Sequence, residues 1–162
     1  GILLGILTNS DLLRFLIEED YTLKKVTRVE NYMTDEVVTI DRDTSLLEAH
    51  RLMGTKRIRS LPVMDGEELA GIVTRTDLMT SDPSRLESHN NQQLSLKILT
   101  QSVEKVMSNP LITISVEAPI TEAARLMMEN KFHVLPVVDK QKKLKGIITE
   151  SDLFLMIVQK FF

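Results

Sequence analysis

The sequence predicts an α/β protein made of two β-α-β-β-α repeats that pack as a pseudo-two-fold pair, preceded by half of another repeat. Residues 32–78 align with residues 106–153, with one residue inserted in a turn of the second copy. Short β-branched runs alternate in both copies with apolar residues at helical spacing. A repeat of about 75 residues is too long for a solenoid and too small for a robust core of its own, so the copies should pack together.

Each repeat is expected to open with a strand, at residues 37–40 and 111–114, because these residues are mostly β-branched. Apolar residues then follow at helical spacing in both copies, namely Leu46, Leu47, Ala49, His50 and Met53, and Ile120, Ala123, Ala124, Met127 and Met128. Thr44 and Ser45 are candidate caps of the first helix, and Pro119 suits the first turn of the second. The spacing of the methionines indicates packing in the core or at a dimer interface.

A hairpin and a second helix should complete each repeat. Its predicted strands are residues 60–64 and 69–73 in the first copy, and residues 134–138 and 144–148 in the second. Pro62 and Pro136 place the earlier strand of each hairpin at a sheet edge or at a strand start. Turns are expected at 65–66 and 139–142, and helices should begin at Thr74 and Thr149.

The end of the repeat occurs a third time, since Gly5–Leu12 matches Gly71–Leu78 and Gly146–Leu153. Residues 1–7 are expected to form a buried strand. The first half of this copy is not in the sequence, so we expect the chain to be part of a longer protein. The predicted organisation is a half repeat with a connecting helix (1–28), a first repeat (29–80), a polar linker (81–102) and a second repeat (103–162).

The composition argues against several classes of protein. The net charge is −3, which does not suit a protein whose main partner is nucleic acid. No cysteine is present, which fits a reducing compartment such as the cytoplasm. The apolar runs are too short for membrane contact. The motifs of a nucleophile elbow, a phosphate-binding loop and a zinc protease are missing, and His50, His89 and His133 lack carboxylates at ligand spacing, so neither an enzyme nor a metal site is expected.

The repeated pattern resembles the CBS domain, a family named after cystathionine β-synthase. The resemblance depends on the Leu-Pro-Val strand and on Gly-Ile-x-Thr-x-[Ser/Thr]-Asp-Leu, and it covers roughly residues 29–80 and 103–160 and half a motif in 1–20. It implies a regulatory module that forms a homodimer, binds AMP, ADP, ATP or S-adenosylmethionine between motifs, and signals to an attached enzyme or transporter. It implies no catalytic residue and no cofactor.

The resemblance also implies roles for individual residues. Asp77 and Asp152 would accept hydrogen bonds from ribose hydroxyls, which suits an acceptor-only carboxylate. Phosphate contacts would come from four residues, Arg59, His133, Thr74 and Thr149. The adenine pocket would include Val38, Thr39, Ile112 and Thr113. His133 would bind phosphate only when protonated. Ser60 and Val134 stand where the family often has a second basic residue, which favours AMP over a polyphosphate.

Structural roles explain the same residues without a ligand. Thr-x-x-Asp at a strand-to-helix turn is a capping box, in which the Thr and the Asp satisfy the first amides of the helix. Asp11 is assigned to capping alone. Arg59 and His133 could be ordinary surface residues, and the adenine-pocket residues could be core strand. Two other functions therefore remain open: a ligand-free oligomerisation module, and a magnesium-linked transporter regulator that uses Asp35, Glu36 and Asp82.

Overall fold

The computed structural model describes residues 4–6, 8–18, 27–80, 98–109 and 111–161, and the chain divides into two compact units. Unit 2 is continuous and comprises residues 37–111. Unit 1 is discontinuous and comprises residues 1–36 and 112–162. The second unit along the chain is thus inserted into the first.

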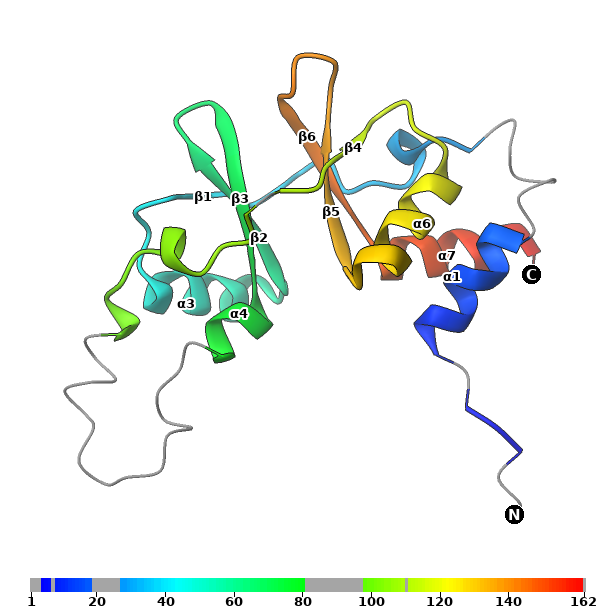
Figure 1. Ribbon diagram of the computed structural model, residues 1–162, viewed down its shortest axis with the longest axis horizontal. Coiled ribbons are helices and arrows are strands. Elements are labelled where there is room, and N and C mark those ends of the chain that lie inside the picture. The colour runs from blue at the N-terminus through cyan, green and yellow to red at the C-terminus, as the bar shows by residue number, and fades with distance from the viewer. Residues whose placement is uncertain (1–3, 7, 19–26, 81–97, 110, 162) are drawn as a thin grey trace. The chain divides into compact units, whose positions relative to one another are not determined.

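Unit 2 contains a three-stranded sheet in the order β1-β2-β3. Strand β1 runs parallel to β2, and β2 runs antiparallel to β3. Figure 1 shows α3 and α4 near the end of the sheet where β2 begins. Its elements are β1 (Ile40–Asp41), α3 (Leu46–Lys56), β2 (Ser60–Asp65), β3 (Glu68–Thr74), α4 (Arg75–Thr80) and the 3-10 turn η3 (Val103–Lys105).

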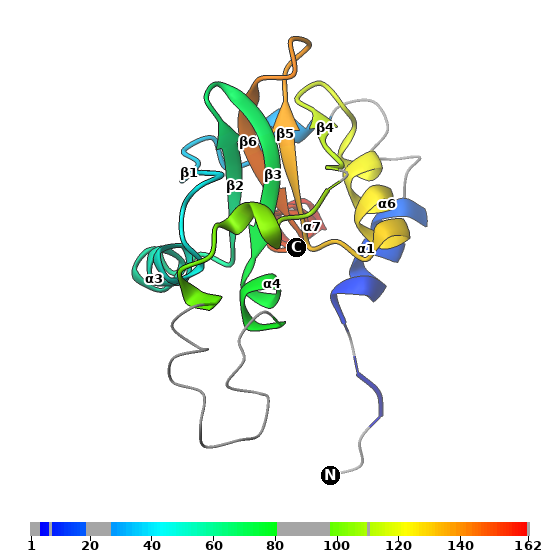
Figure 2. The same cartoon turned by 60° about the vertical axis from the view of Figure 1, so that its left-hand side comes forward.

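Unit 1 repeats this plan with the sheet order β4-β5-β6, and its described residues also include a helix, α1, that contacts α6 and α7. Figure 2 shows the β5–β6 hairpin with β4 beside β5. Its elements are α1 (Asn9–Glu18), the 3-10 turn η1 (Val29–Asn31), β4 (Ile114–Ser115), α6 (Ile120–Asn130), β5 (Val134–Val138), β6 (Leu144–Thr149) and α7 (Glu150–Phe161). The predicted mixed α/β fold with a duplicated plan is confirmed.

The segment that leads into each repeat packs on the sheet of the other repeat. Thr34 and Ile147 exchange two backbone hydrogen bonds of 2.9 Å in unit 1. In unit 2 the amide of Ser108 donates to the carbonyl of Ile72, also at 2.9 Å. Each sheet is therefore completed by residues from the beginning of the opposite repeat.

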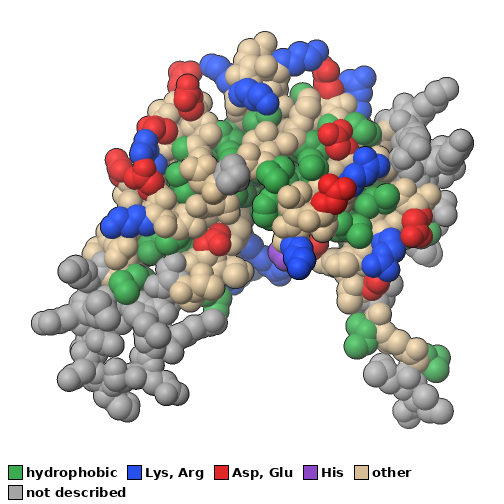
Figure 3. Space-filling model, in the orientation of Figure 1, with side chains coloured by type: hydrophobic (Ala, Val, Ile, Leu, Met, Phe, Trp, Pro, Cys, Tyr) green, Lys and Arg blue, Asp and Glu red, His purple; other side chains and the backbone are tan. Residues whose placement is uncertain are grey.

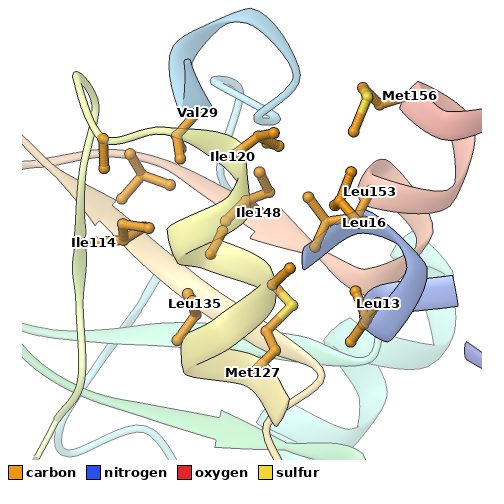
Figure 4. Packing of buried hydrophobic residues seen from close by; sticks show 14 of the residues in the cluster. Leu13, Leu16, Val29, Ile114, Ile120, Met127, Leu135, Ile148, Leu153 and Met156 are labelled. Carbon is orange, nitrogen blue, oxygen red and sulfur yellow. The ribbon is translucent and has the colours of Figure 1, made fainter. Parts of the chain in front are cut away.

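Side chains from helices and strands fill the core of unit 1 (Figure 4). Leu13 and Leu16 on α1 point toward Met127 on α6 and Leu153 on α7, and all four are buried. Met53 occupies the equivalent buried place in unit 2. The prediction that Met53 and Met127 pack in the core is confirmed, and Met128 packs half-buried against the same core.

The opening strands are shorter than predicted. Only Ile40 and Ile114 of the two predicted runs belong to β1 and β4, which have two residues each. The β-branched residues ahead of them are in neither helix nor strand, and none of the described strands pairs with them. Such residues fit a half-buried extended segment as well as a strand, so composition alone did not separate the two.

The predicted sheet-edge position of the prolines is wrong, and Pro62 and Pro136 are the third residues of β2 and β5. Strands β2 and β5 are central in their sheets, not at the edge. Pro62 is tolerated because β1 pairs with β2 only at Val63 and Met64, so the strand has a neighbour on just one side at Pro62. Pro136 is placed in the same way, since β4 pairs only with Val137 and Val138. Both prolines lie on a locally open side of a central strand.

Two smaller predictions are corrected at the helix and chain starts. Of the predicted strand at 1–7, residues 4–6 form no strand, and Leu4 and Ile6 are 95% and 79% exposed, because none of the described strands pairs with them. Residues 1–3 and 7 lie outside the described residues. Pro119 is the N-cap of α6 and precedes its first turn.

Ser45 caps α3 as predicted, and its hydroxyl accepts from the amide of Glu48 at 3.2 Å. Residues 81–97 of the predicted linker lie outside the described residues.

Candidate functional site

Three Thr-x-x-Asp boxes occur in the structure with the same hydrogen bonds. In unit 2, Oδ2 of Asp77 accepts from the amide of Thr74 at 2.7 Å and from its hydroxyl at 2.6 Å. In unit 1, Oδ2 of Asp152 accepts from the amide and hydroxyl of Thr149 at 2.8 and 2.7 Å. Each Thr hydroxyl oxygen accepts in return from the amide of the Asp at 3.3 Å. The capping role predicted for these residues is confirmed.

The third box, in the half repeat, has the same geometry at the start of α1. Oδ2 of Asp11 accepts from the hydroxyl and the amide of Thr8 at 2.6 and 2.9 Å. These hydrogen bonds, with the hydroxyl bond as the largest contribution, hold the pKa of Asp11 below its ordinary value. Asp11 caps its helix, as the sequence predicts.

The hydroxyl proton of each Thr is committed to a carboxylate. A Thr side chain has one proton to donate, and Thr74 and Thr149 donate it to Asp77 and Asp152. A phosphate contact by either hydroxyl would require that bond to break. The phosphate-binding part of the hypothesis therefore depends mainly on the basic residues beside the boxes.

The hairpins bring Arg59 and His133 next to the boxes. Ser60 pairs with Thr74 across the β2–β3 ladder, and the carbonyl of Arg59 accepts from the amide of Arg75 at 2.8 Å. The carbonyl of His133 accepts in the same way from the amide of Glu150 at 3.1 Å. Both Arg59 and His133 are exposed, so each presents its side chain to solvent beside the first turn of a helix.

The predicted adenine-pocket residues lie toward the end of each sheet that carries the Thr-x-x-Asp box. Because β1 runs parallel to β2 with Ile40 opposite Val63, the residues before Ile40 extend toward Ser60, where the box lies. Val38 is half-buried against the unit 2 core, and Thr39 is exposed. In unit 1, Ile112 and Thr113 are half-buried, and Ile112 packs against the core. Each unit thus gathers its three groups of candidate residues at one end of its own sheet.

Three residues beside the boxes were missed in the sequence: Asn9, Arg75 and Glu150. They directly follow the Thr of each box and align in one column of the threefold repeat. The three residues differ in charge, since Asn9 is neutral, Arg75 is positive and Glu150 is negative. This difference within one aligned column was the signal that could have identified them. The structure gives this column a role, because Oε2 of Glu150 lies 2.9 Å from Nδ1 of His133 and accepts from Asn9.

The described part of the chain shows no group of three His, Asp or Glu side chains arranged to hold a metal ion. Asp35 and Glu36 are exposed, while Asp82 lies outside the described residues. None of the described helices is long and apolar enough to cross a membrane. On the face shown in Figure 3, acidic and basic side chains are interspersed, in keeping with the small net charge.

The family model of the CBS domain matches residues 29–83 and 103–159, which are more than half of the chain. The chain belongs to the CBS domain family. A CBS domain-containing protein of Dictyostelium discoideum is 33% identical over 132 residues, which are 81% of this chain and 91% of that protein. The predicted family and its tandem pair of domains are therefore confirmed.

Two solved CBS structures are similar over most of the chain. A Methanocaldococcus jannaschii protein, proposed to be an archaeal homologue of g-AMPK, superposes with a TM-score of 0.80 at 28% identity. The match covers 96% of this chain and 55% of that one. The Arabidopsis thaliana CBS-pair protein CBSX2, solved in complex with AMP, superposes with a TM-score of 0.69 at 31% identity and covers 83% of this chain and 98% of CBSX2.

Proposed function

We propose that this CBS pair is a non-catalytic regulatory module that binds an adenine nucleotide at its Thr-x-x-Asp boxes. The AMP complex of CBSX2, which is 31% identical, is the observation that carries this proposal. The ligand candidates are AMP, ADP, ATP and S-adenosylmethionine, and AMP is favoured because each box has a single basic residue ahead of its strand, followed by Ser60 or Val134.

Asp77 and Asp152 would bind the ribose hydroxyls while they continue to cap their helices. Each Asp uses Oδ2 for its Thr. Among the described residues, Asp152 makes no hydrogen bond through Oδ1, and this side chain is half-buried, not sealed in the core. A carboxylate oxygen has two lone pairs and can accept from two donors. Capping therefore positions the carboxylate for the ligand and does not compete with it.

Arg59 and His133 would contact the phosphate, and the backbone of Val38–Thr39 and Ile112–Thr113 would contact adenine. A guanidinium group matches phosphate oxygens with two parallel donors, so Arg59 is the stronger of the two basic residues. The Thr74 and Thr149 hydroxyls would contribute only after release from their Asp partners. Binding would shift the population of conformations if the ligand prefers one of them. An attached enzyme or transporter domain, or a second copy in a cytoplasmic homodimer, would detect that shift.

Isothermal titration calorimetry with AMP, ADP, ATP, S-adenosylmethionine and Mg²⁺ tests this proposal. The double variant Asp77→Ala/Asp152→Ala should weaken nucleotide binding by about 10- to 150-fold, because it removes charge-assisted hydrogen bonds to ribose. Asp11→Ala is the matched control, because it breaks an identical capping box that we do not assign to a ligand. Its nucleotide affinity should stay within about twofold of the unaltered chain.

The capping boxes also support a second candidate, a ligand-free oligomerisation module, because capping alone accounts for Asp77 and Asp152. Calorimetry separates the two candidates. If none of the four adenine compounds releases heat or raises the melting temperature, the oligomerisation module is the better description. A response to Mg²⁺ alone would indicate the magnesium-linked regulator instead. Equal affinity in the double variant and the unaltered chain would assign both carboxylates to capping only.

A further inference from the structure

Glu150 is a carboxylate held by side chains from two other elements. Its Oε2 accepts from Nδ2 of Asn9, the first residue of α1, at 3.1 Å. The same oxygen lies 2.9 Å from Nδ1 of His133, which precedes β5. The Glu150 side chain is only 12% exposed, whereas that of His133 is 80% exposed. Two partners and near burial fix this negative charge directly beside the Thr149–Asp152 box.

Arg75 occupies the same backbone position in unit 2. Arg75 follows Thr74 as Glu150 follows Thr149, and both amides donate to the carbonyl of the residue that precedes the hairpin. The charges differ although the backbone is the same. Arg59 and Arg75 bring two permanent positive charges to the unit 2 box. His133 and Glu150 sum to zero when the imidazole is protonated and to one negative charge when it is neutral.

We propose that Glu150 is a specificity-determining residue, which directs the unit 1 box to phosphate-free adenosine ligands and leaves phosphate-bearing nucleotides to the unit 2 box. This inference rests on the proposed function, since it assumes that both boxes hold ribose, and it narrows that function by leaving the phosphate contact to Arg59 in unit 2 and not to His133 in unit 1. A fixed carboxylate repels phosphate, and a repulsive group of this kind creates specificity against the competing ligand. It also engages one of the two ring nitrogens through which His133 could bind phosphate. A neutral or cationic group on the ligand meets no such repulsion.

The test compares adenosine with AMP in a chain whose unit 2 box is weakened, so that the tighter binding reports on unit 1. Calorimetry is performed at neutral pH on Asp77→Ala and on Asp77→Ala/Glu150→Gln. In Asp77→Ala, adenosine should bind about tenfold or more tightly than AMP, because like charges facing each other in a site are costly. Adding Glu150→Gln should reduce this preference to about threefold or less. Gln keeps an acceptor for Asn9, so the local packing should survive, and circular dichroism checks it.

Glu122→Gln in the Asp77→Ala background is the matched control. Glu122 is an exposed residue in the first turn of α6, so this change removes the same charge from unit 1 without touching the box. The preference for adenosine should remain. Equal binding of AMP and adenosine in Asp77→Ala, or an unchanged preference after Glu150→Gln, would overturn the inference.

The failure of this inference can be told apart from failure of the proposed function. If the unaltered chain binds AMP but Asp77→Ala binds neither compound, the unit 1 box is not a nucleoside site. The inference about Glu150 is then wrong, while nucleotide binding at unit 2 stands. If the unaltered chain binds neither AMP nor adenosine, the proposed function itself fails.

Discussion

Units 1 and 2 each contain a three-stranded sheet with a hairpin and a capping box, but in the described residues they differ in what packs on their first long helix. In unit 1, α1 packs on α6, where Thr121 and Ala124 are buried. The aligned residues on α3 of unit 2 are Leu47, which is 50% exposed, and His50, which is also exposed. Among the described residues, the same two aligned positions are therefore buried on α6, where α1 packs, and exposed on α3, so a duplicated plan need not produce duplicated packing.

The largest effect expected from this comparison is at Leu16. Leu16 on α1 is fully buried among α6 and α7 side chains. Leu16→Ala should lower the free energy of unfolding by about 2–5 kcal/mol, the range for a large-to-small change in a core. Leu47→Ala on α3 is the control and should change it by about 0.5 kcal/mol or less. Chemical denaturation measures the free energy of unfolding of both variants. Similar losses would contradict the conclusion that Leu16 is a core residue and Leu47 a surface residue.

The next effect separates two glycines that the alignment treats as equivalent. An added Cβ on Gly146 would lie 2.7 Å from the carbonyl oxygen of Thr34, which already accepts a backbone hydrogen bond from Ile147. The three atoms nearest an added Cβ on Gly71 all belong to the Met107 side chain, with the sulfur at 2.6 Å. An added Cβ on Gly146 would also meet the sulfur of Met33, at 2.8 Å. A flexible thioether can move more easily than a backbone carbonyl.

Gly146→Ala should therefore cost about 1–3 kcal/mol of stability, as overpacking usually does. Gly71→Ala should cost about 1 kcal/mol or less, because Met107 can adopt another rotamer. Thermal unfolding of both variants measures the difference. A larger loss for Gly71→Ala would show that the methionine contact dominates at both positions.

A smaller effect concerns the starts of α3 and α6. The Ser45 hydroxyl caps α3, so Ser45→Ala should cost about 1 kcal/mol. Pro119 makes no side-chain cap for α6, and its φ of −66° is the value that the ring prefers. Pro119→Ala should then cost about 0.4–1 kcal/mol of stability, mainly because it increases the conformational entropy of the unfolded chain. Urea denaturation should rank Ser45→Ala as equal to or worse than Pro119→Ala.

The smallest effect is a difference in acid sensitivity. The Lys140 ammonium lowers the pKa of Glu117, and the Thr8 hydroxyl lowers that of Asp11. Both groups belong to unit 1. A carboxyl with a lower pKa in the folded state binds fewer protons there, so its contribution to stability is present above the ordinary carboxyl pKa and is lost as pH falls through the folded value.

Amide hydrogen exchange at pH 6 and at about pH 3.5, near the ordinary carboxyl range, can follow the two units separately. Protection should fall slightly more in unit 1 than in unit 2. Glu117→Gln should reduce this extra loss, while Glu48→Gln, an exposed glutamate on α3, should not. An equal fall in both units would assign acid sensitivity to other groups.

The repeat made most of the fold predictable. The aligned Leu-Pro-Val and Gly-Ile-x-Thr segments predicted both hairpins and the helices that follow them, and these appear as β2–β3 and β5–β6. The opening strands and the prolines were misplaced because strand neighbours are set by tertiary pairing, which local composition does not contain. The contacts of Glu150 with Asn9 and His133 were missed for a related reason. Asn9 and Glu150 are far apart in sequence and meet only when α1 packs on α6 and α7.

The insertion of residues 37–111 within unit 1 has a consequence for synthesis on the ribosome. Unit 2 is continuous, so all the residues that form its sheet are available as soon as its last residue leaves the exit tunnel. Thr34 must instead wait for Ile147 before its backbone is paired. The backbone of unit 1 is therefore completed last, and its slow step should be the long-range loop closure.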